Sequence, residues 1–173
     1  MLIKIIASCV IIICSAYAGQ LFAARLTERV RQLSDFQTAL SMLEFDIVFL
    51  SNPLGDAMRK VASSQKAAVA KIFRSAADGI AAGRGETAGA AWSRALAAHK
   101  KALELSDAEL EILSDFGARL GSGDTESQIN NIKITSVKLK VAEEAAAAIS
   151  KKNGKLSRGL GVLGGVLLVI LFF

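Results

Sequence analysis

Hydrophobic residues gather at the two ends of the chain, and charged residues fill the segment between them. Residues 5–24 carry no formal charge, and residues 159–173 carry none either. An α-helix rises about 1.5 Å per residue, so the first run covers roughly 30 Å, the thickness of a bilayer's hydrocarbon core. The pattern predicts a transmembrane helix at residues 1–24 and a C-terminal membrane segment at residues 155–173, with one domain of residues 25–154 between them.

Each apolar run leaves one alternative open. Ala16-Tyr17-Ala18 resembles the motif before a signal-peptide cleavage site, so the first run is either a retained span or a cleaved signal peptide. Its length and the Arg-rich stretch after it favour the span. The last run covers only about 22 Å from Gly159, or about 28 Å if Lys155 and Arg158 reach outward from a longer helix. That helix either crosses the membrane or enters it without crossing.

Basic residues lie on the inner side of both apolar runs: Arg25, Arg29, Arg31, Lys151, Lys152, Lys155 and Arg158. Lys and Arg flank membrane spans on the cytoplasmic side, so both flanks place residues 25–154 in the cytoplasm. These flanking residues account for much of the net charge of +5. We expect that charge to orient the protein in the membrane and to contact anionic lipids. Elsewhere acids dilute the basic residues, and a single Trp and a single Tyr offer little surface for base stacking. Nucleic acid is therefore not an expected partner.

The middle segment has the hydrophobic period of a helix. After residue 25, apolar residues recur in steps of three and four, at Leu26, Val30, Leu33, Phe36, Leu40, Leu43, Ile47 and Leu50. This spacing places them on one face of a long amphipathic helix that no breaker separates from the first apolar run. The chain has one proline and no β-branched alternation, so the predicted fold class is all-α.

Capping and turn residues divide the middle segment into a compact bundle of about six helices, the first and last extended into the membrane segments. Asn52 predicts the N-cap of the second helix. Ser106 and Thr125 predict the N-caps of the fifth and sixth, each followed three residues later by Glu or Gln as in a capping box. The second to sixth helices are expected at 53–64, 65–81, from about 86, at 106–121 and at 125–149, with a break at Asn153-Gly154.

No group of residues has the pattern of a catalytic, cofactor or metal site. His99 is the only histidine, and no partner for acid–base work is visible beside it, so a surface or packing role is expected. Cys9 and Cys14 both lie in the first apolar run, which leaves the domain without thiolate ligands or disulfides. Trp92 lies on a helical stripe and is expected in the core. The sequence predicts a protein that is not an enzyme.

The densest polar cluster is residues 124–128. Capping explains Thr125 and Gln128, and Asp124 and Glu126 also suit the positive end of a helix dipole. Capping does not require so many polar side chains together, however. Asp124, Glu126 and Gln128 therefore form a candidate partner interface, and both interpretations stay open.

Two glycines in the C-terminal run, Gly161 and Gly165, lie four residues apart. Small residues at this spacing let a second helix approach closely within a membrane. A homo-oligomer is one assembly that this spacing would permit, although the same spacing also arises by chance in a short glycine-rich stretch.

Local motifs follow one another along the chain: Arg25-Leu26-Thr27-Glu28-Arg29-Val30-Arg31-Gln32-Leu33, Pro53-Leu54-Gly55-Asp56-Ala57, Ala91-Trp92 with Ala95-Leu96, and Leu120-Gly121-Ser122-Gly123-Asp124-Thr125-Glu126-Ser127-Gln128. With the N-terminal span and the Gly-rich tail, this order resembles the stage III sporulation protein AB family of endospore-forming bacteria over nearly the whole chain. The last motif is the most specific. Gly55 is a departure, because the family often has a second proline there.

The resemblance implies a role that composition and spacing do not show. Members of that family belong to the channel between mother cell and forespore, in the mother-cell membrane around the forespore. Their cytoplasmic domain is similar to those of platform proteins in type II secretion and type IV pilus machines. The implied function is a non-enzymatic membrane platform, with a secretion-type ATPase (stage III sporulation protein AA-like) and other channel proteins as partners. The alternative is a membrane-anchored helical scaffold or regulatory protein unrelated to secretion.

Overall fold

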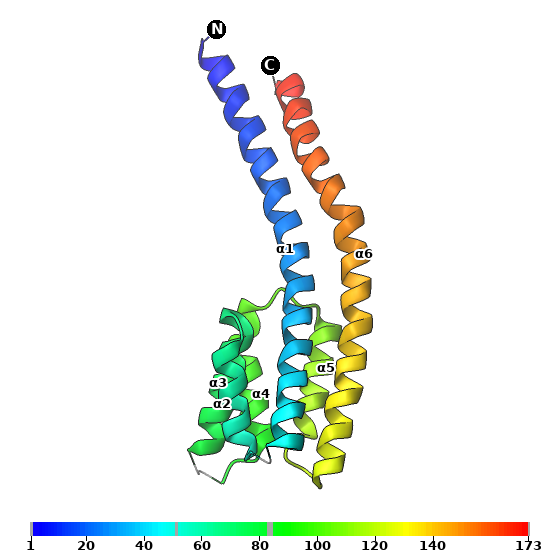
Figure 1. Ribbon diagram of the computed structural model, residues 1–173. Helices are drawn as coiled ribbons and strands as arrows, with labels where there is room; N and C mark the ends of the chain where they lie inside the picture. Colours follow the sequence, from blue (N-terminus) through cyan, green and yellow to red (C-terminus); the bar gives the residue numbers. More distant parts are fainter. Residues whose placement is uncertain (1, 51, 83–84, 173) are drawn as a thin grey trace. The chain divides into compact units, whose positions relative to one another are not determined.

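The computed structural model is all-helical in the residues it describes, which are 2–50, 52–82 and 85–172 (Figure 1). Some side chains in these ranges lie outside the description: those of residues 2–9, 11, 12, 67, 155–162, 165–168 and 170–172. The elements in chain order are α1 (Leu2–Phe49), α2 (Leu54–Ser64), α3 (Ala67–Ala81), α4 (Ala88–His99), the 3₁₀ helix η1 (Lys100–Ala102), α5 (Asp107–Ala118) and α6 (Thr125–Phe172). The predicted fold class is confirmed.

The chain divides into two compact units. One unit, Arg31–Glu143, is a helical bundle that lies within the predicted domain of residues 25–154. The other consists of Met1–Val30 and Glu144–Phe173, the outer parts of α1 and α6. Among the residues that the structure describes, no helix is long and apolar enough to cross a membrane. Much of residues 1–24 and 155–173 lies outside the described side chains, Lys155 and Arg158 included.

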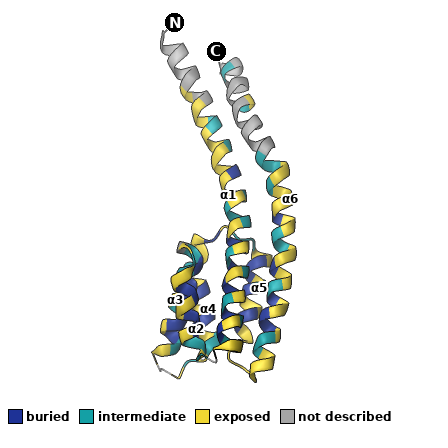
Figure 2. Cartoon of the chain, in the orientation of Figure 1, coloured by how far each residue is buried: buried dark blue, intermediate teal, exposed yellow. Residues whose placement is uncertain are grey.

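Within the bundle, α1 lies between α2–α4 on one side and α5 and α6 on the other (Figure 1). The predicted apolar stripe of α1 faces the interior, where Leu33, Phe36, Leu40 and Leu43 are fully buried (Figure 2). At the end of the stripe Leu50 is 46% exposed. The period of three and four therefore identified the buried face of α1, but not the point at which burial ends.

Trp92 of α4 forms the centre of the bundle's aromatic cluster. Its ring makes edge-to-face contacts with Phe73 of α3 and Phe116 of α5, each with centroids 5.1 Å apart. Its Nε1–H donates a 2.8 Å hydrogen bond to the Leu113 carbonyl of α5. All three rings are buried. Edge-to-face pairs add about 0.5–1.5 kcal/mol each beyond the area they bury, so this cluster fastens α3, α4 and α5 together.

Two glycines let α4 and α5 approach each other. A Cβ on Gly117 of α5 would collide with the indole ring of Trp92, and a Cβ on Gly89 of α4 would lie 2.6 Å from the Gly117 carbonyl oxygen. Neither position has room for a larger residue. The close packing of α4 on α5 depends on these two glycines.

Polar side chains with buried heads join α1 to its neighbours. The Gln32 amide accepts from the Glu104 N–H at 2.8 Å, and its NH₂ lies 3.5 Å from the Ala102 carbonyl, which holds the segment before α5 against α1. The carboxylate of Asp46, 1% exposed, accepts a 2.6 Å bond from the Lys60 ammonium of α2. A buried carboxylate without such a partner would destabilise the fold, so Asp46 fixes the position of α2 on α1.

Two predicted helix signals are wrong. Asn52 is not the N-cap of α2: Pro53, with extended backbone, occupies that position, and no side chain caps the helix. The Pro53 carbonyl begins the helical ladder instead, by accepting from the Asp56 and Ala57 N–H groups. The predicted break at Asn153-Gly154 does not occur, because α6 continues through it. An isolated glycine weakens a helix by only about 1 kcal/mol, which long helical flanks on both sides override.

In the unit formed by the chain ends, small residues line the described contacts. Ala23 of α1 and Ala146 of α6 are each 2% exposed. A Cβ on Gly164 would lie 3.7 Å from the Ser15 hydroxyl oxygen, an ordinary contact distance. Gly164 therefore lies against α1 of its own chain. The side chains around Gly161 and Gly165, where a helix contact was predicted, lie outside the described residues.

We expect Gly117→Ala to destabilise the bundle by about 1–3 kcal/mol, the usual effect of forcing a methyl group into a packed core. The better helix propensity of alanine offsets about 1 kcal/mol at most. Thermal unfolding of the full-length protein in detergent, followed by the fluorescence of its single Trp, measures the change.

Gly55→Ala in α2 is the matched control. A Cβ there would lie 3.4 Å from Cγ2 of Ile80, so this variant should be as stable as the wild type or slightly more so. Equal melting temperatures for Gly117→Ala and the wild type would contradict the proposed packing.

Candidate functional site

The candidate polar cluster lies at the end of the bundle where α1 ends and α6 begins (Figure 1). Asp124 is the residue that caps α6. Its carboxylate accepts from the Ser127 N–H at 2.9 Å, and its carbonyl accepts the first helical bond, from the Gln128 N–H at 3.1 Å. Thr125 is already the first helical residue. The predicted Thr125 cap is therefore wrong by one position, because Asp124 offers an equally good cap one residue earlier.

Gln128 stabilises the loop before α6. Its carbonyl oxygen accepts from the Gly121 N–H at 3.0 Å, and its NH₂ donates to the carbonyls of Arg119, at 3.2 Å, and Ser122. The loop turns through Gly121 and Gly123, whose φ angles of 74° and 85° are strained for other residues. The conformation that brings the chain from α5 into α6 thus depends on one amide and two glycines.

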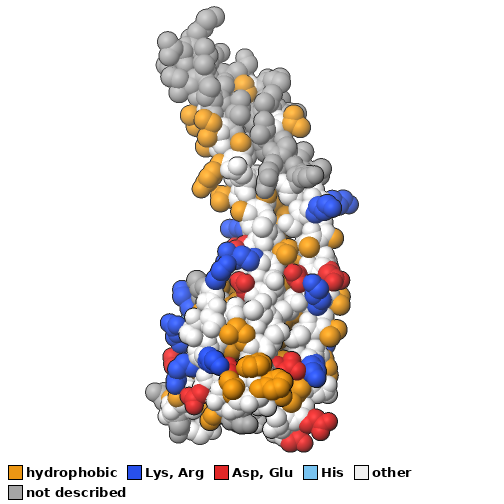
Figure 3. Space-filling model, viewed as in Figure 1, with side chains coloured by type: hydrophobic (Ala, Val, Ile, Leu, Met, Phe, Trp, Pro, Cys, Tyr) orange, Lys and Arg blue, Asp and Glu red, His pale blue; other side chains and the backbone are white. Residues whose placement is uncertain are grey.

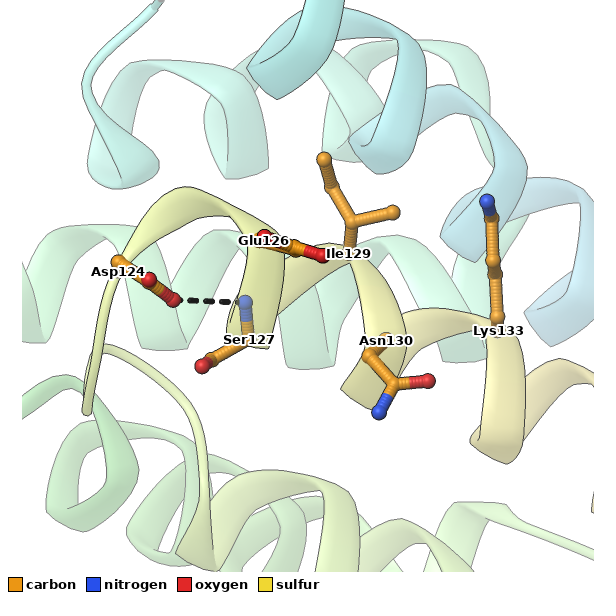
Figure 4. A pocket seen from close by; sticks show the side chains of 6 residues that line it. All are labelled: Asp124, Glu126, Ser127, Ile129, Asn130 and Lys133. Atoms are coloured by element: carbon orange, nitrogen blue, oxygen red, sulfur yellow. Dashed lines mark hydrogen bonds between the residues drawn. The ribbon is translucent and has the colours of Figure 1, made fainter.

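Glu126 is exposed in the first turn of α6. It lines an open pocket with Asp124, which precedes α6, and with Ser127, Ile129, Asn130 and Lys133 from the first turns of α6 (Figure 4). The pocket has carboxylates at one end and the Lys133 ammonium at the other. Of the three predicted interface residues, Asp124 and Gln128 have structural roles within the chain. Asp124 and Glu126 are both exposed, but only Glu126 lacks such a role.

The capping bond also affects the acidity of Asp124. Hydrogen bonds from the Ser127 side chain and backbone stabilise the charged carboxylate and so lower the pKa of Asp124. At the far end of the bundle's α6 segment, a bond from Gln37 in α1 and the Lys140 ammonium lower the pKa of Glu143. Both carboxylates are therefore charged at neutral pH, and their bonds weaken only in acid.

Exposed apolar residues at the end of α1 were not predicted as part of a site. Phe45, Val48, Phe49 and Leu50 are 53%, 39%, 71% and 46% exposed. The rings of Phe45 and Phe49 pack against each other with centroids 5.0 Å apart. Figure 3 shows apolar side chains gathered at this end of the bundle, with acidic ones nearby. The signal was available in the sequence, because Phe45 and Phe49 are apolar residues outside the buried stripe.

The other predicted residues fall into three groups. Ser106 caps α5 in a complete capping box with Glu109. The flanking residues Arg25, Arg31, Lys151 and Lys152 are exposed, and Arg29 is half-buried. His99 is half-buried at the end of α4, with Nε2 2.9 Å from the Ser75 hydroxyl oxygen. In the described part of the chain, no three His, Cys, Asp or Glu residues are grouped to hold a metal ion.

Comparison with known proteins gives one family throughout. The family model for stage III sporulation protein AB matches residues 4–173. The chain belongs to the stage III sporulation protein AB family. Stage III sporulation protein AB of Bacillus subtilis (strain 168) is 31% identical over 170 residues, 98% of this chain and 99% of that protein. A solved structure of a stage III sporulation protein AB, also 31% identical, aligns with a TM-score of 0.67 over 71% of this chain and 96% of its own.

Membership of this family confirms the resemblance drawn from the motifs. The family name supports a role specific to sporulation. The loop motif Leu120-Gly121-Ser122-Gly123-Asp124-Thr125-Glu126-Ser127-Gln128 forms the connection from α5 into α6. Most of these residues have a defined structural task in the turn from α5 into α6.

We expect Asp124→Ala to lower the melting temperature more than Thr125→Ala, because only Asp124 accepts the capping bond. Substitutions of exposed residues without such a role usually change stability by no more than about 0.5 kcal/mol, and Thr125→Ala should stay within that limit. Thermal melts of both full-length variants at neutral pH measure the order. The reverse order would restore Thr125 as the cap.

Asp124→Asn is the control that separates the cap from the charge. Asn is as good an N-cap as Asp, so this variant should melt near the wild type at neutral pH. The lowered pKa of Asp124 makes the charged cap stabilising above the unfolded-state pKa, and this contribution disappears as the pH falls through the folded-state pKa. The wild type should thus lose more stability than Asp124→Asn as the pH falls below about 4.

Proposed function

We propose that the protein is a non-enzymatic membrane platform of the channel between mother cell and forespore, and that it couples a cytoplasmic secretion-type ATPase to membrane channel proteins. The observation that carries this proposal is membership of the sporulation family across residues 4–173, a range that includes both apolar ends. A role that requires two ends in a membrane and a folded unit between them accounts for the whole of the matched sequence.

The anchoring part of the proposal rests on charge and hydrophobicity. Residues 5–24 and 159–173 are uncharged, and the basic residues lie on the bundle side of each run. This arrangement favours membrane insertion of both ends with residues 25–154 in the cytoplasm. In a sporulating cell that location is the mother-cell membrane around the forespore, with the bundle on the side where ATP is available to a partner.

The coupling part rests on the bundle end that carries Glu126 and the exposed residues of α1. Phe45 and Phe49 offer aromatic surface, and aromatic residues are the commonest anchors of protein interfaces. Glu126 adds a negative charge that would attract a basic surface of the ATPase. Asp124 and Gln128 fix the conformation of the start of α6 through their hydrogen bonds. This end is the proposed docking site for the ATPase.

Passive coupling, rather than catalysis, fits the side chains that are present. The pair of His99 and Ser75 resembles a base and a nucleophile, but the described residues place no carboxylate in hydrogen-bond contact with the imidazole to orient it. A hydrogen bond that joins α3 to α4 explains the pair equally well. ATP hydrolysis is therefore assigned to the partner, and the platform contributes position and rigidity.

The anchoring is tested by accessibility of an introduced cysteine. In a protein with Cys9 and Cys14 replaced by Ser, we expect Ala98→Cys, at an exposed position of α4, to react with a membrane-impermeant maleimide only after cells are permeabilised. In non-sporulating cells that carry the protein in the plasma membrane, Lys4→Cys, before the first apolar run, should react without permeabilisation. Labelling of Ala98→Cys in intact cells would place the bundle outside the cytoplasm.

The docking site is tested by binding of the purified secretion-type ATPase from the same organism. We expect Glu126→Lys to weaken binding about fivefold, mainly through slower association, and Phe49→Ala to weaken it about tenfold or more. Surface plasmon resonance with the platform in lipid nanodiscs gives both rates. Glu126→Lys should also make binding less sensitive to salt.

Glu111→Lys, which changes an exposed acid on α5, is the matched control and should bind like the wild type. Melting temperatures of all three variants show whether each is folded. Normal binding by Glu126→Lys and Phe49→Ala would place the ATPase elsewhere. No binding by the wild type would favour the alternative of a scaffold unrelated to secretion.

A further inference from the structure

The bundle part of α6 carries a buried stripe and an exposed apolar stripe with the same spacing. One consists of Ile132, Thr135 and Leu139, which are 1%, 3% and 0% exposed and pack inside the bundle. The other consists of Ile134, Val137 and Val141, displaced by two residues and 40%, 64% and 63% exposed. Two residues correspond to about 200° around an α-helix, so the second stripe lies on the opposite face of α6. It is called the outer stripe below.

The outer stripe is unfavourable for an isolated protein on two counts. Exposure of these apolar side chains to water raises the free energy of the folded protein. All three residues are also β-branched, which makes them poor helix formers at exposed positions. Contiguous exposed apolar residues of this kind mark interaction sites. Their spacing of three and then four residues matches the seam that one helix offers to another.

Lysines flank the outer stripe on both sides. Lys133 and Lys140 lie on one flank and Lys138 on the other, and their side chains are 63%, 56% and 49% exposed. Their ion pairs within the chain, with Glu44, Glu143 and Asp115, span 3.1–3.7 Å. Exposed pairs of this kind contribute little stability, so the ammonium groups remain available to a partner. Figure 3 shows apolar, basic and acidic side chains along the α6 edge of the bundle.

The flanking charges decide between a second copy and a different partner. If two copies met along this stripe in parallel, Lys133 of one would face Lys138 of the other. If they met antiparallel, Lys138 would face Lys138, and Lys133 would face Lys140. Both arrangements bring like charges together across an apolar seam, which opposes association. A helix with carboxylates at the flanking positions would instead pair with the same lysines.

We propose that the outer stripe binds an amphipathic helix of another protein, with aliphatic residues along its seam and Asp or Glu on both flanks. The aliphatic residues cover Ile134, Val137 and Val141, and the carboxylates pair with Lys133, Lys138 and Lys140. This site differs in place and in charge from the end of the bundle, where Glu126 attracts a basic partner. Its occupancy does not depend on the identity of the ATPase.

The test uses three synthetic helical peptides of about four heptads each. The first has an aliphatic seam and Glu flanks, the second has the same seam and Lys flanks, and the third has a Ser seam and Glu flanks. Binding to the full-length protein in nanodiscs of zwitterionic lipid is measured by fluorescence anisotropy, with empty nanodiscs as the blank. We expect the first peptide to bind at least about tenfold more tightly than either of the others.

Variants of the outer stripe then locate the site. Val137→Ser with Val141→Ser should weaken binding of the first peptide by about tenfold, and Lys138→Glu should shift the preference toward the peptide with Lys flanks. Ile149→Ser, an exposed apolar position of α6 outside the outer stripe, should leave binding unchanged. The charge swap keeps the test valid if the double variant folds poorly, because it leaves the apolar residues intact.

Three results would overturn the proposal. Equal binding of the peptides with Glu and Lys flanks would remove the charge argument, and unchanged binding by both stripe variants would place the peptide elsewhere. A dimer in sedimentation analysis that dissociates in the Val137→Ser, Val141→Ser variant would assign the outer stripe to a second copy of the chain.

Discussion

The contact between Trp92 and Gly117 is the constraint on which the rest of the bundle depends. The indole lies directly on the backbone of α5, where any side chain at Gly117 would displace it, and its Nε1–H is satisfied by the Leu113 carbonyl. Because this contact fixes α5, it also fixes α6, whose Asn131 amide donates a 3.1 Å bond to the Phe116 carbonyl. The turn into α6, held by Gln128, follows from the same placement. The candidate docking end is thus positioned by a core contact made in a different part of the sequence.

Local patterns predicted those features of the fold that depend on a few neighbouring residues. The buried stripe of α1 and the capping box at Ser106 follow from spacing alone, and both form. The N-cap of α6 does not follow from spacing alone, because Asp124 and Thr125, one residue apart, can both accept a capping hydrogen bond. The choice depends on Gln128, which bonds to the loop carbonyls of Arg119 and Ser122 and is therefore not available as the partner of a Thr125 cap. Such a contact is not visible in a sequence read locally.

Local sequence patterns also identified only part of the candidate site. A search for polar clusters found residues 124–128 but could not separate the side chains that hold the helix end and the loop, Asp124 and Gln128, from that of Glu126. It also passed over Phe45 and Phe49, because apolar residues on a helix next to a core stripe are usually assigned to the core. Only burial distinguishes the two cases, and here the rings are 53% and 71% exposed. Both helices with exposed apolar surface, α1 and α6, bury their other face in the bundle.

The polar side chains at the start of α6 have different roles, which accounts for their density. Asp124 satisfies the helix end and Gln128 satisfies the loop, so neither has to be reorganised when Glu126 meets a charged partner. Ordering loops and side chains on association lowers affinity, and here that ordering is already complete in the unbound protein. In the proposed docking role, a rigid base for Glu126 would account for a cluster in which most side chains hold the chain itself. The cap interpretation is confirmed for Asp124, and the interface interpretation stays a prediction that now concerns Glu126.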